Sequence, residues 1–226
     1  AGHQISLIGR PTVLDQISQS QGIFLSDYAG RQEQVAPPTL LSTLGDEVFD
    51  LVFVSVKCHH LESAVDDLVK LSQTRAALIF MQNGLGSLEA IRPRLKGDRI
   101  FQGITPFNVL SKANARFHRG TEGDLQLPLT DETKILKHSL NNIGYGCELY
   151  DDMRPIIYGK LLLNLNNALN AISGLPLKTE LEDRRYRKVL AAAMEEWLQV
   201  CKKQNISLRT SSALPSILIP HVLRLP

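Results

Sequence analysis

The sequence predicts an α/β fold in which a doubly wound parallel sheet is followed by an all-helical domain. Two continuous apolar runs, residues 49–56 and 76–82, are typical of strands covered on both faces. Between them, residues 60–72 carry apolar side chains at helical spacing, which completes a strand–helix–strand unit. From Met153 onward no stretch has a strand pattern, and long helical patterns take its place.

The remaining elements follow from hydrophobic period and turn residues. Alternating apolar side chains predict a first strand at 5–9, ended by Gly9-Arg10-Pro11. Further along the chain we expect a helix at 87–95, a strand at 99–104, two short strands within 115–128 and a helix with an acidic first turn at 131–142.

The change from strand patterns to long helical patterns near residue 150 predicts two domains, 1–150 and 151–226. The second contains helices expected at 156–172 and 180–204, with Gly174 as a C-terminal cap and Pro176 as a break between them.

Composition excludes several classes of protein. A net charge of +2 with intermixed acids and bases contains no long basic run, so nucleic acid is not expected as a partner. The three cysteines contain no CxxC pair, which favours neither a disulfide framework nor a zinc site and fits a reducing cytoplasm. No apolar run is long enough to span a bilayer, and we expect no signal peptide and no membrane.

In a doubly wound sheet, ligands bind at the carboxyl ends of the strands. After the first expected strand comes Arg10, where a fold that prefers NAD carries an acid; an arginine there suits the 2′-phosphate of NADP. The alternative is a solvated arginine before a proline. After the second strand comes Lys57, placed to lie along a cofactor, and then His59 and His60, whose adjacent positions on a helix suit a metal poorly.

The third strand is followed by MQNGLG (81–86). Gly84 and Gly86 allow a tight turn and close approach to a ligand, and Asn83 offers both a donor and an acceptor. Asn-Gly is also the commonest tight-turn dipeptide, so the alternative is a simple turn.

One helix combines a cation with amides. At 100° per residue, Lys160, Asn164 and Asn167 lie within about 60° of one another, while Leu161, Leu165, Ala168 and Leu169 are expected on the opposite side. Buried polar groups need partners, so this stripe is expected to face a polar cleft. The alternative is a solvated face with a snorkelling lysine.

Five segments, taken in order, resemble the ketopantoate reductases (2-dehydropantoate 2-reductases): AGHQISLIGR, VKCHHLESA, MQNGLG, RGTEGDLQL and YGKLLLNLNNALNAISGLP. The resemblance covers nearly all of the chain. It implies a Rossmann-like NADP-binding domain joined to a helical domain, with a keto acid bound between them. It also implies a strand and a GxGxxG loop ahead of AGHQISLIGR, and a serine and a glutamate beyond the final RLP.

The resemblance further implies roles for individual residues. Lys160 corresponds to the general acid, Asn83 to a polar contact near nicotinamide and substrate, Asn164 to a substrate contact and Arg10 to the 2′-phosphate contact. Asn167 departs from the family spacing by one residue, because the second helix asparagine of the family falls at Ala168.

Three functions are compatible with this resemblance. The first is NADPH-dependent reduction of 2-dehydropantoate to pantoate for pantothenate and coenzyme A synthesis. The second is reduction of a related 2-keto acid, since the fold does not choose the substrate. The third is an inactive nucleotide-binding sensor. The leucine-rich tail at 217–225 is expected to pack on further helices or in a homodimer.

Overall fold

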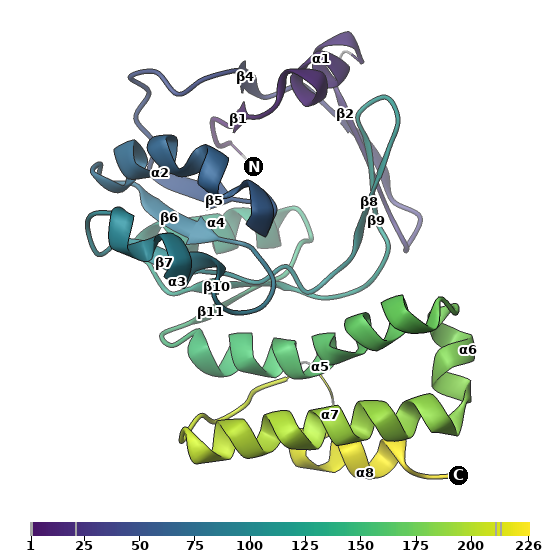
Figure 1. The fold of residues 1–226 in the computed structure, drawn as a ribbon. Coiled ribbons are helices and arrows are strands. Elements are labelled where there is room, and N and C mark those ends of the chain that lie inside the picture. Colours follow the sequence, from purple (N-terminus) through teal and green to yellow (C-terminus); the bar gives the residue numbers. More distant parts are fainter. Residues whose placement is uncertain (1, 21, 211, 213) are drawn as a thin grey trace. The chain divides into compact units, whose positions relative to one another are not determined.

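The computed structural model describes residues 2–20, 22–210, 212 and 214–226 (Figure 1). The chain divides into two compact units. The first comprises Ala1–Gln82 and Ser87–Asp151, and the second comprises Asn83–Gly86 and Asp152–Pro226. The first unit contains all strands of the described chain, and the second is helical.

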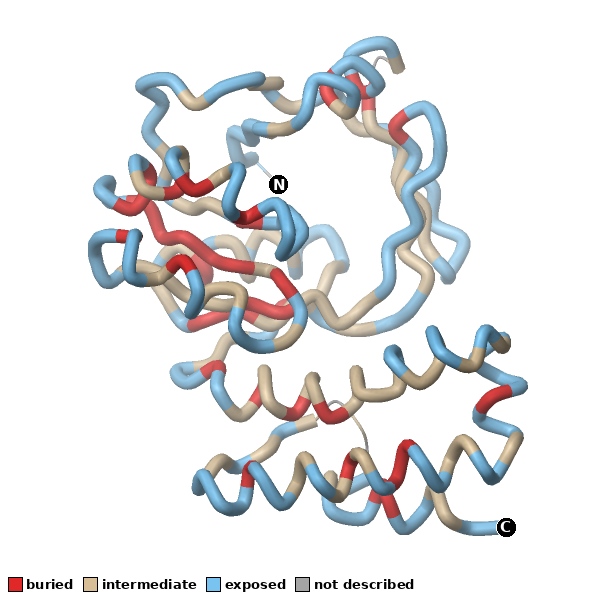
Figure 2. Tube along the Cα trace, in the orientation of Figure 1, coloured by how far each residue is buried: buried red, intermediate tan, exposed pale blue. Residues whose placement is uncertain are grey.

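The centre of the first unit is a parallel sheet in the order β5-β6-β7, formed by Leu51–Val54, Ala77–Phe80 and Ile100–Gln102. This confirms the two predicted apolar strands and the strand after them. All four residues of β6 are buried, as a continuous apolar run requires, and they stand out in Figure 2. β5 is covered less completely than its sequence predicts, because Phe53 is 39% exposed.

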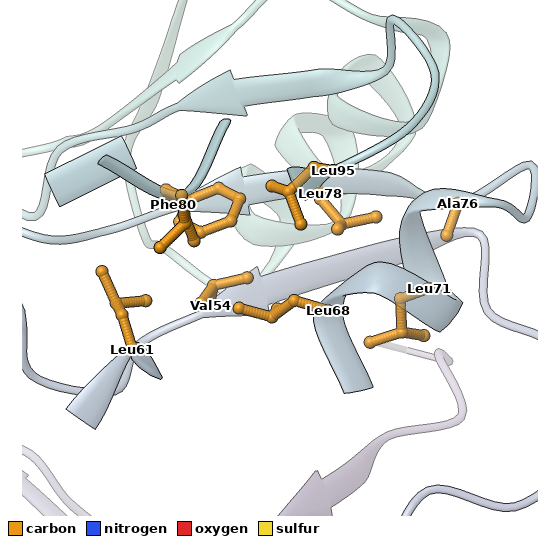
Figure 3. Close-up of a cluster of buried hydrophobic side chains, with 9 residues drawn as sticks. Val54, Leu61, Leu68, Leu71, Ala76, Leu78, Phe80 and Leu95 are labelled. Carbon is orange, nitrogen blue, oxygen red and sulfur yellow. The ribbon is translucent and has the colours of Figure 1, made fainter. Parts of the chain in front are cut away.

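One face of this sheet packs against the helix that follows β5. Figure 3 shows Val54 of β5, Leu78 of β6 and Leu68 of α2 (Val65–Ser72) in one buried cluster. The helix predicted at 60–72 is α-helical only in its second half. Two 3₁₀ turns precede α2, η1 (Cys58–His60) and η2 (Glu62–Ala64). Ser63 Oγ donates to the His60 carbonyl at 2.8 Å, a local bond that competes with the α-helical pattern.

The predicted first strand is β1 (Ser6–Ile8), which pairs in parallel with β4 (Thr39–Leu41). Between them the sequence analysis missed a helix, α1 (Pro11–Gln19). Pro11 was interpreted as a breaker, but it occupies the first helical turn, where its missing N–H costs nothing.

A four-stranded sheet in the order β3-β2-β9-β8 was also largely missed. Its strands are Gln32–Val35 (β3), Ile23–Asp27 (β2), Arg116–Arg119 (β9) and Val109–Lys112 (β8). β3 and β8 are mostly exposed and lack an alternating apolar pattern, so hydrophobic periodicity did not predict them.

The two strands expected within 115–128 exist, as β9 and β10 (Leu125–Pro128). They do not pair with each other. β9 lies between β2 and β8, whereas β10 pairs in parallel with β11 (Cys147–Tyr150), a strand that the sequence analysis missed.

Two helices complete the first unit. The helix predicted at 131–142 is confirmed to the residue as α4 (Asp131–Asn142), because Thr130 and Thr133 form a reciprocal capping box at its start. The helix predicted at 87–95 is α3 (Ser87–Ile91) followed by the 3₁₀ turn η3 (Arg92–Arg94).

The helical unit contains α5 (Arg154–Ser173), α6 (Leu177–Glu182), α7 (Arg184–Lys203), η4 (Ser216–Leu218) and α8 (Ile219–Leu223). Gly174 ends α5 with a left-handed φ of 64°, as predicted. The helix predicted at 180–204 is interrupted, because Asp183 caps α7 by accepting from the Arg185 N–H at 2.8 Å.

The core of the helical unit lies between α5, α7 and α8. Its buried residues are Leu162, Leu190, Met194 and Ile219. The buried residues of α5 are Ile156, Gly159 and Leu162. Of the four residues expected on the side opposite the stripe, Leu165 and Leu169 pack against this core, whereas Leu161 is not part of it and Ala168 is exposed.

Candidate functional site

The loops that follow β5 and β6 leave the sheet at the same edge, because the two strands are parallel and Val54 pairs with Phe80. Lys57 lies in the first loop and Asn83 in the second, and both are exposed. Both loops therefore begin at the carboxyl edge of the sheet, where doubly wound sheets bind ligands.

A buried amide joins these two loops. Gln82 donates through Nε2 to the carbonyl oxygens of Val54, at 2.9 Å, and Val56, at 2.7 Å. Its Oε1 is buried and has no hydrogen-bond partner among the described residues. Gln82 is not among the predicted site residues, although an amide directly after a fully buried strand must find partners and is a usable signal.

Each loop has its own local anchor. Lys57 is the extended residue before η1, and Ser87 Oγ at the start of α3 donates to Cys58 Sγ at 3.1 Å. In the second loop Gly84 and Gly86 have φ values of 85° and 90°, a conformation in which L side chains are strained. These two glycines fix the course of the chain beside Asn83.

Arg10 lies at the carboxyl end of β1 and is the N-cap residue of α1. Its side chain is exposed and makes no capping bond, and the first turn of α1 contains no acid. The positive end of the helix dipole and the guanidinium are therefore next to each other, an arrangement that favours an anion.

The predicted polar stripe lies on α5. Lys160 and Asn164 are half-buried, and Asn167 is exposed. At helical spacing these three point away from Leu162, which is buried in the helical unit. Lys160 makes no hydrogen bond or ion pair with any described residue, and burial lowers the pKa of its ammonium.

The other two asparagines of α5 differ from the stripe. Asn170 donates to the Leu175 carbonyl at 3.0 Å and to Glu180 Oε2 at 2.8 Å, so it is occupied in closing the end of the helix. Asn166 has a buried Oδ1 without a partner among the described residues. Glu180, another residue that the sequence analysis missed, is fully buried on α6.

The site residues thus form three groups. Lys160, Asn164 and Asn167 share one helix face, Lys57 and Asn83 follow neighbouring strands, and Arg10 stands at the start of α1. The segment Asn83–Gly86 belongs to the same compact unit as α5, although it follows a strand of the other unit. The structure therefore places Asn83 in one unit with the lysine and the helix asparagines.

Metal ligands do not gather anywhere in the part of the chain that the structure describes. No three histidine, cysteine or acidic side chains come together there, and His59 and His60 contact each other with ring centroids 4.1 Å apart. Nor does any described helix have the length and apolar character to cross a bilayer.

Comparison with known families identifies the family of this chain. The family model described as ketopantoate reductase PanE/ApbA matches residues 1–132, more than half of the chain. The chain belongs to the ketopantoate reductase family. A curated relative, 2-dehydropantoate 2-reductase of Bacillus subtilis (strain 168), is 23% identical over 210 residues, which is 90% of this chain and 68% of the relative.

Solved structures show the same fold. A PanE/ApbA family ketopantoate reductase from Ralstonia eutropha JMP134 has a TM-score of 0.75 at 23% identity, with 99% of this chain and 72% of that chain covered. A D-mandelate dehydrogenase with NADH and anilino(oxo)acetate has a TM-score of 0.78 at 20% identity and the same coverage. The predicted fold class, a Rossmann-like sheet with a helical domain, is confirmed. The family is one of NAD(P)-dependent oxidoreductases of 2-keto acids.

Proposed function

We propose that this family member reduces 2-dehydropantoate to pantoate with NADPH, and that Lys160 is its general acid. The observation that carries the proposal is the state of Lys160. A lysine ammonium that is half-buried, lacks a counter-ion among the described residues and has a lowered pKa is unusual in a structural role. In a ketopantoate reductase it stands where the resemblance expects the acid.

The chemistry explains why a lysine suits this position. When bound, the nicotinamide supplies a hydride to the carbonyl carbon of the keto acid. The Lys160 Nζ donates a proton to the carbonyl oxygen as negative charge develops there. Its positive charge also stabilises that oxygen before the proton is transferred. Burial brings the pKa of Lys160 closer to neutral pH, which makes the ammonium a stronger acid than an exposed lysine.

The amides orient the substrate in this proposal. Asn164 and Asn167 lie on the same helix face as Lys160, and Asn83 belongs to the same compact unit. Each amide offers donors for the carboxylate and carbonyl oxygens of a keto acid. They hold the carbonyl oxygen toward Lys160, whereas the proton comes from the lysine alone.

The residues present fit NADP better than NAD. Arg10, together with the N-terminus of α1, offers a charged and a dipolar partner for a 2′-phosphate, and no acid stands there to bind a free 2′-hydroxyl. Lys57 lies at the end of the neighbouring strand β5 as a further cation for the cofactor. Residues 1–150 are then the nucleotide domain and 151–226 the substrate domain.

Assembly as a homodimer belongs to the same proposal. The helical unit exposes apolar side chains, among them Ile172, 84% exposed, and Ile217, 66% exposed. A structurally similar ketopantoate reductase from Staphylococcus aureus, with a TM-score of 0.67, is described as dimeric.

A second substrate is supported by one comparison. The similar D-mandelate dehydrogenase structure contains anilino(oxo)acetate, an aromatic keto acid derivative. Reduction of an aromatic 2-keto acid is therefore the second candidate, and the same fold serves both substrates.

A substrate panel tests the proposal. Steady-state rates are measured with 2-dehydropantoate, phenylglyoxylate and 2-ketoisovalerate, each with NADPH and with NADH, by following cofactor absorbance. We expect the highest kcat/KM for 2-dehydropantoate with NADPH. A preference for phenylglyoxylate establishes the second candidate, and binding of NADPH without turnover of any keto acid establishes a nucleotide sensor.

Lys160→Ala tests the acid. The variant is expected to lower kcat by roughly 10²- to 10⁴-fold while NADPH affinity stays near that of the wild type. Lys178→Ala is the matched control, because Lys178 is 88% exposed and only loosely paired with Glu182 at 3.8 Å. Wild-type turnover in Lys160→Ala contradicts the assignment.

A further inference from the structure

A backbone crossing lies directly beside Lys160. The segment 206–210, here called the strap, follows α7, and its Arg209 N–H donates to the Pro155 carbonyl of α5 at 3.0 Å. A Cβ at Gly159 would lie 2.0 Å from the Arg209 carbonyl oxygen and 2.6 Å from its carbon. Both atoms belong to the backbone, so no side-chain rotation relieves the overlap. The crossing therefore requires glycine at 159.

The strap is itself held on the N-terminal side of this contact. The Ile206 N–H donates to the Cys201 carbonyl at 2.9 Å, and Leu208 packs on the core of the helical unit. The strap is thus a fixed part of that unit, and its position on α5 is determined by the core.

A second element holds the same turn of α5. Trp197 of α7 donates through Nε1 to the Tyr158 carbonyl at 3.1 Å, and its ring stacks on Tyr158 with centroids 5.4 Å apart and planes at 19°. Pro155, Tyr158 and Gly159 are therefore all in contact with the strap or with α7. These contacts fix the backbone immediately before Lys160.

Lys160 needs such support from its backbone. Its side chain is long and flexible, and no described residue holds its ammonium by a hydrogen bond or an ion pair. The direction of the side chain and its degree of burial then depend on how α5 is rotated and how closely the chain packs around it.

We propose that the crossing at Gly159 is a positioning device for Lys160, with Gly159 and Trp197 as positioning residues that hold the ammonium in its half-buried place. This inference rests on the proposed function, in which Lys160 donates the proton. It adds that the proton donor is placed by the close packing of the α5 backbone against the strap. This packing leaves no room for an added methyl group at residue 159.

The test is pH-dependent amine labelling of Lys160, read by peptide mass spectrometry in wild type and Gly159→Ala. In the wild type we expect Lys160 to become half-labelled at a lower pH than the exposed Lys178 in the same digest, because burial lowers its pKa. In Gly159→Ala the added methyl group separates α5 from the strap and admits water. The labelling curve of Lys160 then moves to higher pH, toward that of Lys178, and kcat falls at least about tenfold.

Two further variants keep the test decisive. Ile219→Ala removes a core side chain of α8 and is expected to lower the melting temperature without moving the Lys160 curve. Trp197→Phe keeps an aromatic ring but loses the indole N–H that donates to the Tyr158 carbonyl, and a smaller shift in the same direction is expected. If Gly159→Ala does not fold, Trp197→Phe decides the question.

An unchanged Lys160 curve in a folded Gly159→Ala protein, with only a lower melting temperature, overturns the proposal and leaves the crossing as packing alone. The labelling does not depend on turnover. If Lys160→Ala retains full activity, the proposed acid is lost, whereas the curve shift still reports whether the crossing positions the lysine.

Discussion

The two units present their site residues in different ways. In the sheet unit Arg10 and Lys57 are exposed, and they are placed by strand ends and helix starts. On α5 Lys160 is half-buried and unpaired on a helix whose other side is packed into a core. In the proposed function, the sheet unit supplies binding contacts to a charged ligand, and the helical unit supplies one group whose protonation is adjusted by burial.

The largest effect on stability is expected in the helical unit, at Glu180. Its Oε2 accepts from Asn170 at 2.8 Å and from Ser173 at 2.9 Å, and the side chain is fully buried. Glu180→Ala leaves a cavity and two donors without their acceptor, so we expect a loss of about 3 kcal/mol in the free energy of unfolding. Urea denaturation measures it.

Glu182→Ala is the control for that change, because this glutamate is exposed and its ion pair with Lys178 is worth little. Glu180→Gln retains an acceptor and is expected to lose less than Glu180→Ala. Equal losses in the alanine variants of Glu180 and Glu182 contradict the view that the helical unit depends on buried polar contacts.

The next effect is expected in the sheet unit, on binding. Arg10→Gln removes the proposed 2′-phosphate contact, a charge-assisted interaction, and should weaken NADPH binding roughly 10- to 100-fold while leaving NADH binding and the melting temperature unchanged. Titration calorimetry with both nucleotides measures the change. Arg75→Gln is the control, since Arg75 is an exposed partner of Asp50 at 2.8 Å. Equal weakening for both nucleotides removes Arg10 from the 2′-phosphate.

Gln82 is expected to affect both stability and cofactor binding, because its buried side chain holds the exposed loop that follows β5. Gln82→Leu leaves the Val54 and Val56 carbonyls without this donor, so we expect about 1–2 kcal/mol of lost stability and a several-fold weaker affinity for NADPH. Gln73→Ala, at an exposed residue that ends α2, is expected to change neither. Weaker stability with unchanged affinity shows that the loop after β5 does not contact the nucleotide.

The sequence predicted elements whose signals are local. The start of α4 was readable because Thr130 caps it, and the buried strand β6 was readable from its continuous apolar run. Exposed strands such as β3 carry no such pattern, and Pro11 was misread because the same residue either breaks a helix or begins one. The pairing of β9 with β2 is a contact over about ninety positions of sequence that no local pattern encodes.

The same limit applies to the site. Lys160, Asn164 and Asn167 were predicted because helical spacing puts them on one face, and the structure places them on one helix. Gln82 and Gly159 were missed because their importance comes from partners distant in sequence, such as Arg209 for Gly159. Glu180 was missed because its partners Asn170 and Ser173 lie on a different helix. Sequence patterns therefore predicted the shared helix face better than the contacts that hold it in place.

The most direct test of the central claim is the pH dependence of kcat for 2-dehydropantoate in the wild type and in Lys160→Arg. Lys160 must be protonated to act, so activity falls as pH rises through its pKa, which burial lowers below the ordinary value of 10.5. Arginine remains protonated throughout, so the residual activity of the variant should show no such fall. A wild-type decline below the ordinary lysine pKa that the variant lacks is the predicted result. The same decline in both proteins, or none in the wild type, contradicts Lys160 as the proton donor.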